Sequence, residues 1–307
     1  MSGRRVAYVA ADHGPRQTLQ VLQSHLPGTS ALERDTELLI CGTSDSARGR
    51  DVEISARLAA SRNGIPSVVI EDFPGNYTTV HGGEPRLLLV DSGLAMRLAH
   101  AKEGGLTVQV VPAVRYDTLR RRLAELRRPA SGANAVLWIG QPETDDSLAT
   151  LRRLLPALAA RAVPVWLRAH PRDAGYSHGA YAGLDVEDVT SSALEDCLAR
   201  RPRLVITQFS SVAIEAGFWG IPSLNVLFPD VGGTTLAAKK GYSVPPWCEE
   251  GAAFLLADPQ ETGNVLDRAL GSIDARNSVM QAFDRYFKVR EEGAPALINL
   301  LYNQGLL

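Results

Sequence analysis

The stretch "VITQFSSVAIEAGFWGIPSLNVLF", residues 205–228, contains two apolar runs separated by a short helical pattern. The first run leads into Ser210 and Ser211, and a Gly-x-Pro turn at 220–222 precedes the second run. Each run is continuously apolar, which is typical of strands in a parallel sheet that is covered on both faces. The stretch therefore predicts a strand–helix–strand unit of an α/β fold.

The same alternation continues over most of the 307 residues. Apolar runs predict strands at 5–10, 36–42, 66–72, 86–91 and 107–111, and again at 135–141, 164–171, 203–210 and 222–229. Helical spacing of apolar residues predicts helices at 18–26, 52–64 and 93–104, and at 145–162, 192–201, 211–219 and 274–303. We therefore predict two doubly wound, Rossmann-like α/β domains that face a central cleft.

A stretch of small residues with Pro and Gly, "PASGANA" at 129–135, separates the two series of strands and predicts a linker. The expected domains are accordingly 1–130 for the acceptor side and 131–307 for nucleotide binding. Whether the helical segment 274–303 crosses back to the first domain is left open by the sequence.

The composition is that of an ordinary soluble protein, with 45% apolar residues and a formal net charge of -2. This near-neutral charge predicts no nucleic-acid partner, and the arginine-rich run 120–128 is interpreted as a solvated helix face. Three widely spaced cysteines indicate a reducing compartment and no structural zinc. Because no signal peptide or apolar stretch of roughly 20 residues is present, we expect a cytoplasmic protein without a membrane span. The sequence leaves the oligomeric state open, and a homodimer is one possibility.

In parallel α/β sheets, ligands bind beyond the carboxyl ends of the strands, so the residues that follow each strand are the candidates for a site. Ser210 and Ser211 stand where a helix begins, and their N–H and hydroxyl groups suit a phosphate, although a plain N-cap explains them as well. Glu215 lies beyond the capping-box position, so it is interpreted either as a ribose ligand or as a surface charge.

"RAHPRD", 168–173, directly follows an apolar run. Pro171 favours an extended His170 at the end of that strand, while Arg168 and Arg172 favour a nearby anion and lower the pKa of the imidazole. His170 could hydrogen-bond a phosphate or protonate one that departs; alternatively, it is an ordinary loop histidine.

In the first half, Asp12 and His13 follow the first strand and Asp72 follows the third. These three are the candidate groups that act on an acceptor hydroxyl, although Asp12 and Asp72 could equally serve the turns in which they lie. No glycine-rich phosphate loop, nucleophile elbow or metal-ligand spacing occurs, so we expect chemistry without a metal or other cofactor.

The pair of motifs His170-Pro171 and Ser210-Ser211, about 40 residues apart, resembles bacterial sialyltransferases and the related teichoic-acid and capsule transferases of the GT-B fold. "VLWIGQP" (136–142) and "SSVAIEAGFWGIPSL" (210–224) are similar to segments of GT-B proteins, including nucleotide-sugar epimerases. The acidic-acidic-Gly motif that supplies the general base of the sialyltransferases has no clean counterpart, because in "EDFPG" (71–75) the glycine does not adjoin the acids.

The resemblance implies that the second domain holds a nucleotide-sugar donor and the first domain holds the acceptor. The expected donor and phosphate ligands are Gly140, Gln141, Arg168, His170, Arg172, Ser210, Ser211 and Glu215. The predicted function is a metal-independent, inverting glycosyltransferase with a CMP- or UDP-linked donor, in which Asp72, Asp12 or His13 is the base. A nucleotide-sugar epimerase or hydrolase of the same fold, and a non-catalytic nucleotide-binding partner protein, are the alternatives.

Overall fold

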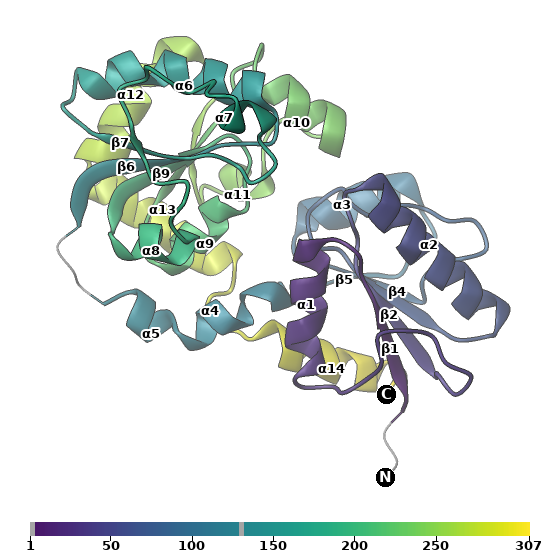
Figure 1. The fold of residues 1–307 in the computed structure, drawn as a ribbon. Coiled ribbons are helices and arrows are strands. Elements are labelled where there is room, and N and C mark those ends of the chain that lie inside the picture. Colours follow the sequence, from purple (N-terminus) through teal and green to yellow (C-terminus); the bar gives the residue numbers. More distant parts are fainter. Residues whose placement is uncertain (1–3, 129–131) are drawn as a thin grey trace. The chain divides into compact units, whose positions relative to one another are not determined.

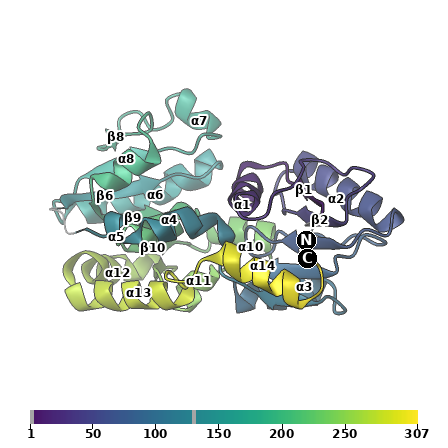
Figure 2. The same ribbon diagram turned by 90° about the horizontal axis from the view of Figure 1, so that it is seen from below.

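The computed structural model describes residues 4–128 and 132–307. The chain forms two compact units: Arg290–Leu307 joins the residues up to Arg121 in unit 1, and Arg122–Val289 forms unit 2 (Figures 1 and 2). This division differs from the expected boundary at 130/131, since the segment from Arg122 onward belongs to unit 2 and the C-terminal segment to unit 1. The expected linker begins outside the described residues, and from Ala133 onward it is part of a strand.

Unit 1 contains a parallel sheet with the order β1-β2-β3-β4-β5 among its described residues. The strands are β1 Val6–Val9, β2 Leu38–Cys41, β3 Ser67–Ile70, β4 Leu87–Val90 and β5 Val108–Val110. The helices are α1 His13–Gln23, α2 Ala47–Arg62, α3 Gly93–Lys102, the 3-10 turn η1 Val114–Tyr116, α4 Asp117–Arg121 and α14 Gly293–Asn303.

The chain changes direction across this sheet at β1. After α1 it returns beside β1, where the N–H of Tyr8 donates to the carbonyl of Thr29 (2.8 Å) and the N–H of Thr29 donates to that of Val6 (2.9 Å). It then crosses to the other side of β1 and forms β2. Because right-handed crossovers in opposite directions place their helices on opposite faces, this reversal makes the sheet doubly wound.

The two faces of the unit 1 sheet are covered by different helices. α1 and α14 pack on one face, where Leu22 and Leu297 share a buried cluster with Tyr8. α2 and α3 pack on the other, where Ala60 and Ala99 are buried against alternate residues of the same strands. Burial on both faces explains why the strands are continuously apolar in sequence.

Unit 2 contains a parallel sheet with the order β11-β10-β9-β6-β7-β8. Its strands are β6 Ala133–Ile139, β7 Val165–Arg168, β8 Glu187–Asp188, β9 Pro202–Thr207, β10 Ser223–Val226 and β11 Phe254–Leu256. Its helices and helical turns are α5 Leu123–Leu126, α6 Thr144–Ala159, α7 Ala174–Ser177, α8 Leu194–Ala199, α9 Val212–Phe218, α10 Gly233–Lys240, α11 Pro246–Glu249, η2 Pro259–Glu261, α12 Thr262–Leu266, η3 Asp267–Gly271 and α13 Ile273–Tyr286. The strand order reverses between β6 and β9, so this sheet is also doubly wound, and the predicted class of two doubly wound α/β domains is confirmed.

Helix packing in unit 2 follows the apolar pattern of the sequence. Leu151, Leu154 and Leu158 of α6 are at most 1% exposed and pack on the sheet. Helices α9 and α13 also pack against each other. Phe218 of α9 contacts Phe283 of α13 edge to face, with ring centroids 5.5 Å apart. A Cβ at Gly217 would lie 2.2 Å from the Phe283 ring, so the close approach of α9 and α13 requires glycine at this position. None of the helices among the described residues is long and apolar enough to span a membrane.

The segment predicted as one helical region at 274–303 forms two helices in different units, α13 and α14. A buried carboxylate attaches α14 to unit 1: Asp117, 0% exposed, accepts the N–H groups of Gly293 and Ala294, each at 2.7 Å. Asp117 also accepts a hydrogen bond from Arg120 at 2.7 Å. The negative charge therefore satisfies the first N–H groups of α14 and a buried guanidinium together.

Replacing Asp117 by Ala should lower the free energy of unfolding of unit 1 by about 3–5 kcal/mol, because it removes the buried carboxylate that Arg120 and the first N–H groups of α14 share. Urea unfolding followed by circular dichroism measures the loss. Glu292→Gln is the matched control: it removes a half-exposed ion pair with Arg121 beside the same helix and should cost less than about 1 kcal/mol. Equal losses in the two variants would contradict the role given to Asp117.

Candidate active site

In unit 2, three adjacent strands bring predicted residues to one edge of the sheet. Ile139 of β6 pairs with Arg168 of β7 on one side and with Thr207 of β9 on the other. The residues that follow these strands, Gly140-Gln141, His170 and Ser210, therefore lie at the same carboxyl edge. This edge includes the point between β6 and β9 where the strand order reverses, which is where α/β sheets open to ligands.

Beneath this edge lies a layer of buried, hydrogen-bonded amides and hydroxyls. The Gln141 amide donates to the Thr207 hydroxyl at 3.0 Å, and this hydroxyl donates to the carbonyl of Ile139 at 3.0 Å. The Asn225 amide donates to the carbonyl of Gln208 at 2.8 Å. The side chain of Gln141, predicted to bind the donor, is thus 4% exposed and part of the floor. Sequence reasoning missed Thr207, Gln208 and Asn225, which lie within or directly after their strands.

The hydrogen bonds of His170 define its tautomer. Its Nδ1 accepts the N–H of Arg172 at 3.0 Å, so the neutral ring carries its proton on Nε2. Burial, followed by the charge of Arg172, lowers the pKa of His170 below its ordinary value. The imidazole is therefore neutral at pH 7. In the part of the chain that the structure describes, Nε2 makes no hydrogen bond, which leaves an N–H donor for an anion.

The other predicted donor ligands have varied surroundings. The hydroxyl oxygen of Ser210 accepts the N–H of Val212, the first residue of α9, at 3.2 Å, whereas the N-cap position is Ser211, whose side chain makes no capping hydrogen bond. Ser211 immediately precedes α9, and Glu215 is half-buried in its first turn. Arg172 is exposed, whereas Arg168 is half-buried with a buried Nε that makes no hydrogen bond among the described residues.

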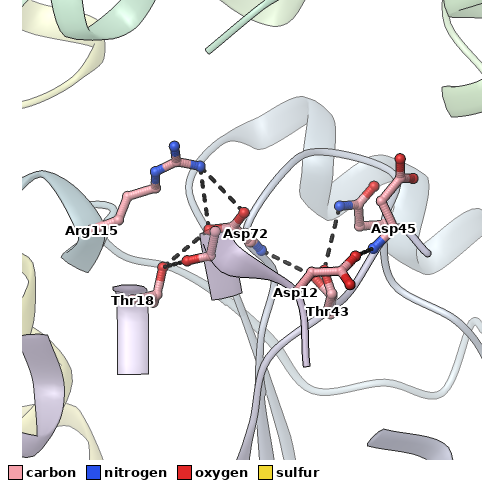
Figure 3. A network of polar contacts seen from close by, with 8 residues as sticks. Asp12, Thr18, Thr43, Asp45, Asp72 and Arg115 are labelled. Carbon is pink, nitrogen blue, oxygen red and sulfur yellow. Dashed lines mark hydrogen bonds and ion pairs between the residues drawn. The ribbon is translucent and has the colours of Figure 1, made fainter. Parts of the chain in front are cut away.

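In unit 1, Asp12 ties together the two loops at the reversal point. Its carboxylate accepts the N–H of Asp45 at 2.9 Å (Figure 3). It also accepts the N–H (2.8 Å) and the hydroxyl (2.6 Å) of Ser46. Its own N–H donates to the Ser44 hydroxyl oxygen, and this hydroxyl donates to the buried Glu53 at 2.6 Å. Asp12 therefore joins the end of β1 to the start of α2, which is the structural role that its position in a turn suggested.

Asp72 is also engaged by its neighbours. The Thr18 hydroxyl donates to its carboxylate at 3.0 Å, and Arg115 contacts both oxygens at 3.3 Å (Figure 3). A Cβ at Gly14 would lie 2.4 Å from Asp72 Oδ2, so glycine at the start of α1 makes room for this carboxylate. Thr18 and Arg115 were missed in the sequence, because helix and loop residues far apart in the chain carry no signal of a shared partner.

His13 differs from both acids. It is the first residue of α1 and is exposed, and its imidazole makes no hydrogen bond or ion pair with any other described residue. Of the three candidate bases, His13 is thus the one whose side chain is not already held by other protein groups.

Two further carboxyl groups are buried at the carboxyl ends of β3 and β4. Glu71 accepts the N–H of Tyr77 at 2.8 Å, while its other oxygen, like one oxygen of Asp91, is buried without a hydrogen-bond partner among the described residues. Burial raises the pKa of Glu71 to about 8 and that of Asp91 to about 6. Glu71 is therefore protonated at neutral pH. Within the described ranges, no group of three or more His, Cys, Asp or Glu side chains could hold a metal ion.

The raised pKa of Glu71 makes the stability of unit 1 depend on pH. A protonated Glu71 binds its proton in the folded state and loses it on unfolding, so the free energy of unfolding should fall as pH rises from about 4.5 to about 8. Glu71→Gln, which mimics the protonated acid, should remove most of this slope. Urea unfolding at a series of pH values measures it, with the exposed Glu33→Gln as control. An unchanged slope in Glu71→Gln would refute the assignment.

No protein-family model matches the chain, and no curated protein matches its sequence. Solved structures are similar in fold. A candidate UDP-N-acetylglucosamine 2-epimerase from Listeria monocytogenes has a TM-score of 0.63 at 12% identity, covering 97% of this chain and 95% of its own. UDP-GlcNAc 2-epimerase from Methanocaldococcus jannaschii has a TM-score of 0.60 at 10% identity, covering 97% and 99%.

The wall teichoic acid polymerase TagF is similar with a TM-score of 0.53 at 10% identity, covering 98% of this chain and 88% of that one. The neighbours thus include an epimerase and a teichoic-acid polymerase, two of the classes of enzyme that the resemblance named. At these identities the likeness concerns the fold, and the protein accordingly has the fold of GT-B enzymes, with one doubly wound parallel sheet in each unit.

Proposed function

We propose that this protein is an enzyme that binds a nucleotide-linked sugar on unit 2 and transfers the sugar to a hydroxyl group. The observation that carries the proposal is the neutral His170, whose Nε2–H is available at the carboxyl edge where the strand order of the sheet reverses. Two structural neighbours support the substrate class: the M. jannaschii epimerase has been solved with UDP-GlcNAc and UDP, and S. aureus MnaA with UDP.

In this proposal, His170 donates a hydrogen bond from Nε2 to a phosphate oxygen of the nucleotide. As the bond between the sugar and the phosphate breaks, negative charge develops on that phosphate, and a preorganised donor stabilises it. Because the lowered pKa of His170 keeps the ring neutral, Nδ1 carries no proton and accepts the N–H of Arg172. This hydrogen bond fixes the orientation of the ring. Ser210, Ser211 and the cationic Arg168 and Arg172 are the further proposed phosphate ligands, and Glu215 is the proposed ribose ligand.

The proposed base for the acceptor hydroxyl is His13. Asp12 is committed to three hydrogen bonds and Asp72 to Arg115 and Thr18, so each would have to give up these partners before it could take a proton. His13 needs no such rearrangement. An exposed imidazole can accept the acceptor's proton as the new glycosidic bond forms, and the transfer is then inverting and independent of a metal.

A second candidate is an epimerase or hydrolase that acts on the same donor without a separate acceptor. It is favoured by the TM-scores of 0.63 and 0.60 to epimerases, compared with 0.53 for TagF. Nucleotide release or sugar isomerisation from the donor alone would favour this candidate, whereas release that depends on an added hydroxyl acceptor would favour transfer.

Nucleotide binding can be tested with a thermal-shift panel of CMP, CDP, UDP, GDP and TDP. A nucleotide at about 100 times its dissociation constant should add about 2.7 kcal/mol to the stability of the folded state. His170→Ala should abolish turnover of the donor while largely retaining nucleotide binding, whereas His178→Ala, an exposed histidine after α7, should change neither. The absence of a shift with every nucleotide would refute the donor site.

The base can be tested separately. His13→Ala should reduce transfer by roughly 10²–10⁴-fold, the usual contribution of general base catalysis, without weakening nucleotide binding. His25→Ala, which removes an exposed imidazole just after the same helix, is the control. If His13→Ala is as active as the control while Asp72→Asn is inactive and still folded, Asp72 is the base and our assignment is wrong.

A further inference from the structure

A cavity of about 670 Å³ lies at the other end of the unit 2 sheet from the candidate active site. It is lined where β6, β9 and β10 begin, by residues including Ala133, Pro202 and Pro222, and by the side of α13 at Arg276 and Met280. The candidate active site lies where β6 and β9 end, so the cavity is a separate place on the same unit. Its volume is in the usual range for small-molecule sites.

The cavity is strongly cationic. Its described lining contains the arginines 127, 128, 201, 203 and 276 and no Asp or Glu. Arg127 is paired with Asp284 at 2.7 Å, but among the described residues no carboxylate pairs with the other four. Apolar side chains, including Trp219 and Met280, complete the wall.

The arrangement of Arg203 and Arg276 is unusual because both donate to the same acceptor. Each guanidinium contacts the carbonyl of Leu270 at 2.5 Å, and Arg203 also donates to the Asn134 side chain at 2.8 Å. Two like charges that converge on one neutral oxygen repel each other, and burial together with the charge of Arg203 lowers the pKa of Arg276. An anion placed between them would remove this repulsion.

We propose that this cavity binds a small molecule that carries two phosphoryl groups, with Arg203 and Arg276 as its central ligands and Arg128 at its rim. Guanidinium groups present planar pairs of N–H donors that match phosphate oxygens, and several together favour a multiply charged group over a single charge. The apolar wall around Trp219 accommodates the organic part of such a ligand. The site is independent of the proposed glycosyl-transfer function, because it uses none of the same residues.

Isothermal titration calorimetry of the full chain with inorganic pyrophosphate tests the proposal, with inorganic phosphate for comparison. We expect pyrophosphate to bind more tightly than phosphate, and Arg203→Gln and Arg276→Gln each to weaken pyrophosphate by about tenfold or more. Arg128→Gln should weaken it less, and because this exposed side chain makes no hydrogen bond or ion pair with a described residue, the change removes no internal contact. Fructose 1,6-bisphosphate carries its two phosphates on different carbon atoms. Comparing its affinity with that of pyrophosphate shows whether the cavity prefers two directly linked phosphates or two separate ones.

Two control variants distinguish binding in this cavity from binding elsewhere on unit 2. Arg153→Gln removes an equal charge from an exposed ion pair with Asp230 on the same unit and should leave pyrophosphate binding unchanged. His170→Ala, which alters the candidate active site, should leave the binding that depends on Arg203 and Arg276 unchanged. Loss of binding in His170→Ala alone would place the anion in the candidate active site and overturn the proposal. Absence of binding to the wild type, or wild-type affinity in both Arg203→Gln and Arg276→Gln, would show that these arginines only brace the carbonyl of Leu270.

Discussion

The candidate site residues at the carboxyl edge of each sheet owe their positions to one constraint, the right-handed crossover between parallel strands. In unit 1 the chain first returns beside β1 through the two hydrogen bonds between β1 and Thr29, then continues on the other side as β2. In unit 2 the same reversal separates β6 from β9. At each reversal the next helices begin on opposite faces, so the strand ends open to solvent there. Asp12 and Gln141 occupy these two positions.

Much of this fold could be predicted, because a strand that is buried on both faces must be apolar throughout. The same reasoning could not find β8, which has two exposed acidic residues, or the segment at Thr29, which makes a single bridge. It also could not assign α14 to a unit, since an apolar helix face looks the same whichever sheet it covers. The contact that decides this, from Asp117 to the N–H groups of Gly293 and Ala294, joins residues 176 and 177 positions apart.

In the candidate site, too, the sequence could not show which side chains contact one another. Residue type and strand position led to Asp12, Asp72 and His13, but only the structure shows that the two acids are held by other groups. Likewise, the arginine run 120–128 was interpreted as a solvated face, and this was wrong in part. Arg120 is 6% exposed and bound to Asp117, while Arg127 pairs with Asp284 across unit 2. The sequence of a charged run does not show which distant residues its side chains contact in the folded chain.

The central claim, that the neutral His170 presents Nε2–H to the phosphate of a nucleotide, can be tested directly by long-range ¹H–¹⁵N NMR of the histidine rings, with His170→Ala used for assignment. We expect His170 of the free protein to be neutral at pH 7 with its proton on Nε2. A nucleoside diphosphate that binds should shift the Nε2 resonance while Nδ1 remains the unprotonated acceptor of the Arg172 N–H. A proton on Nδ1, or a spectrum of His170 that saturating nucleotide leaves unchanged, would contradict the claim.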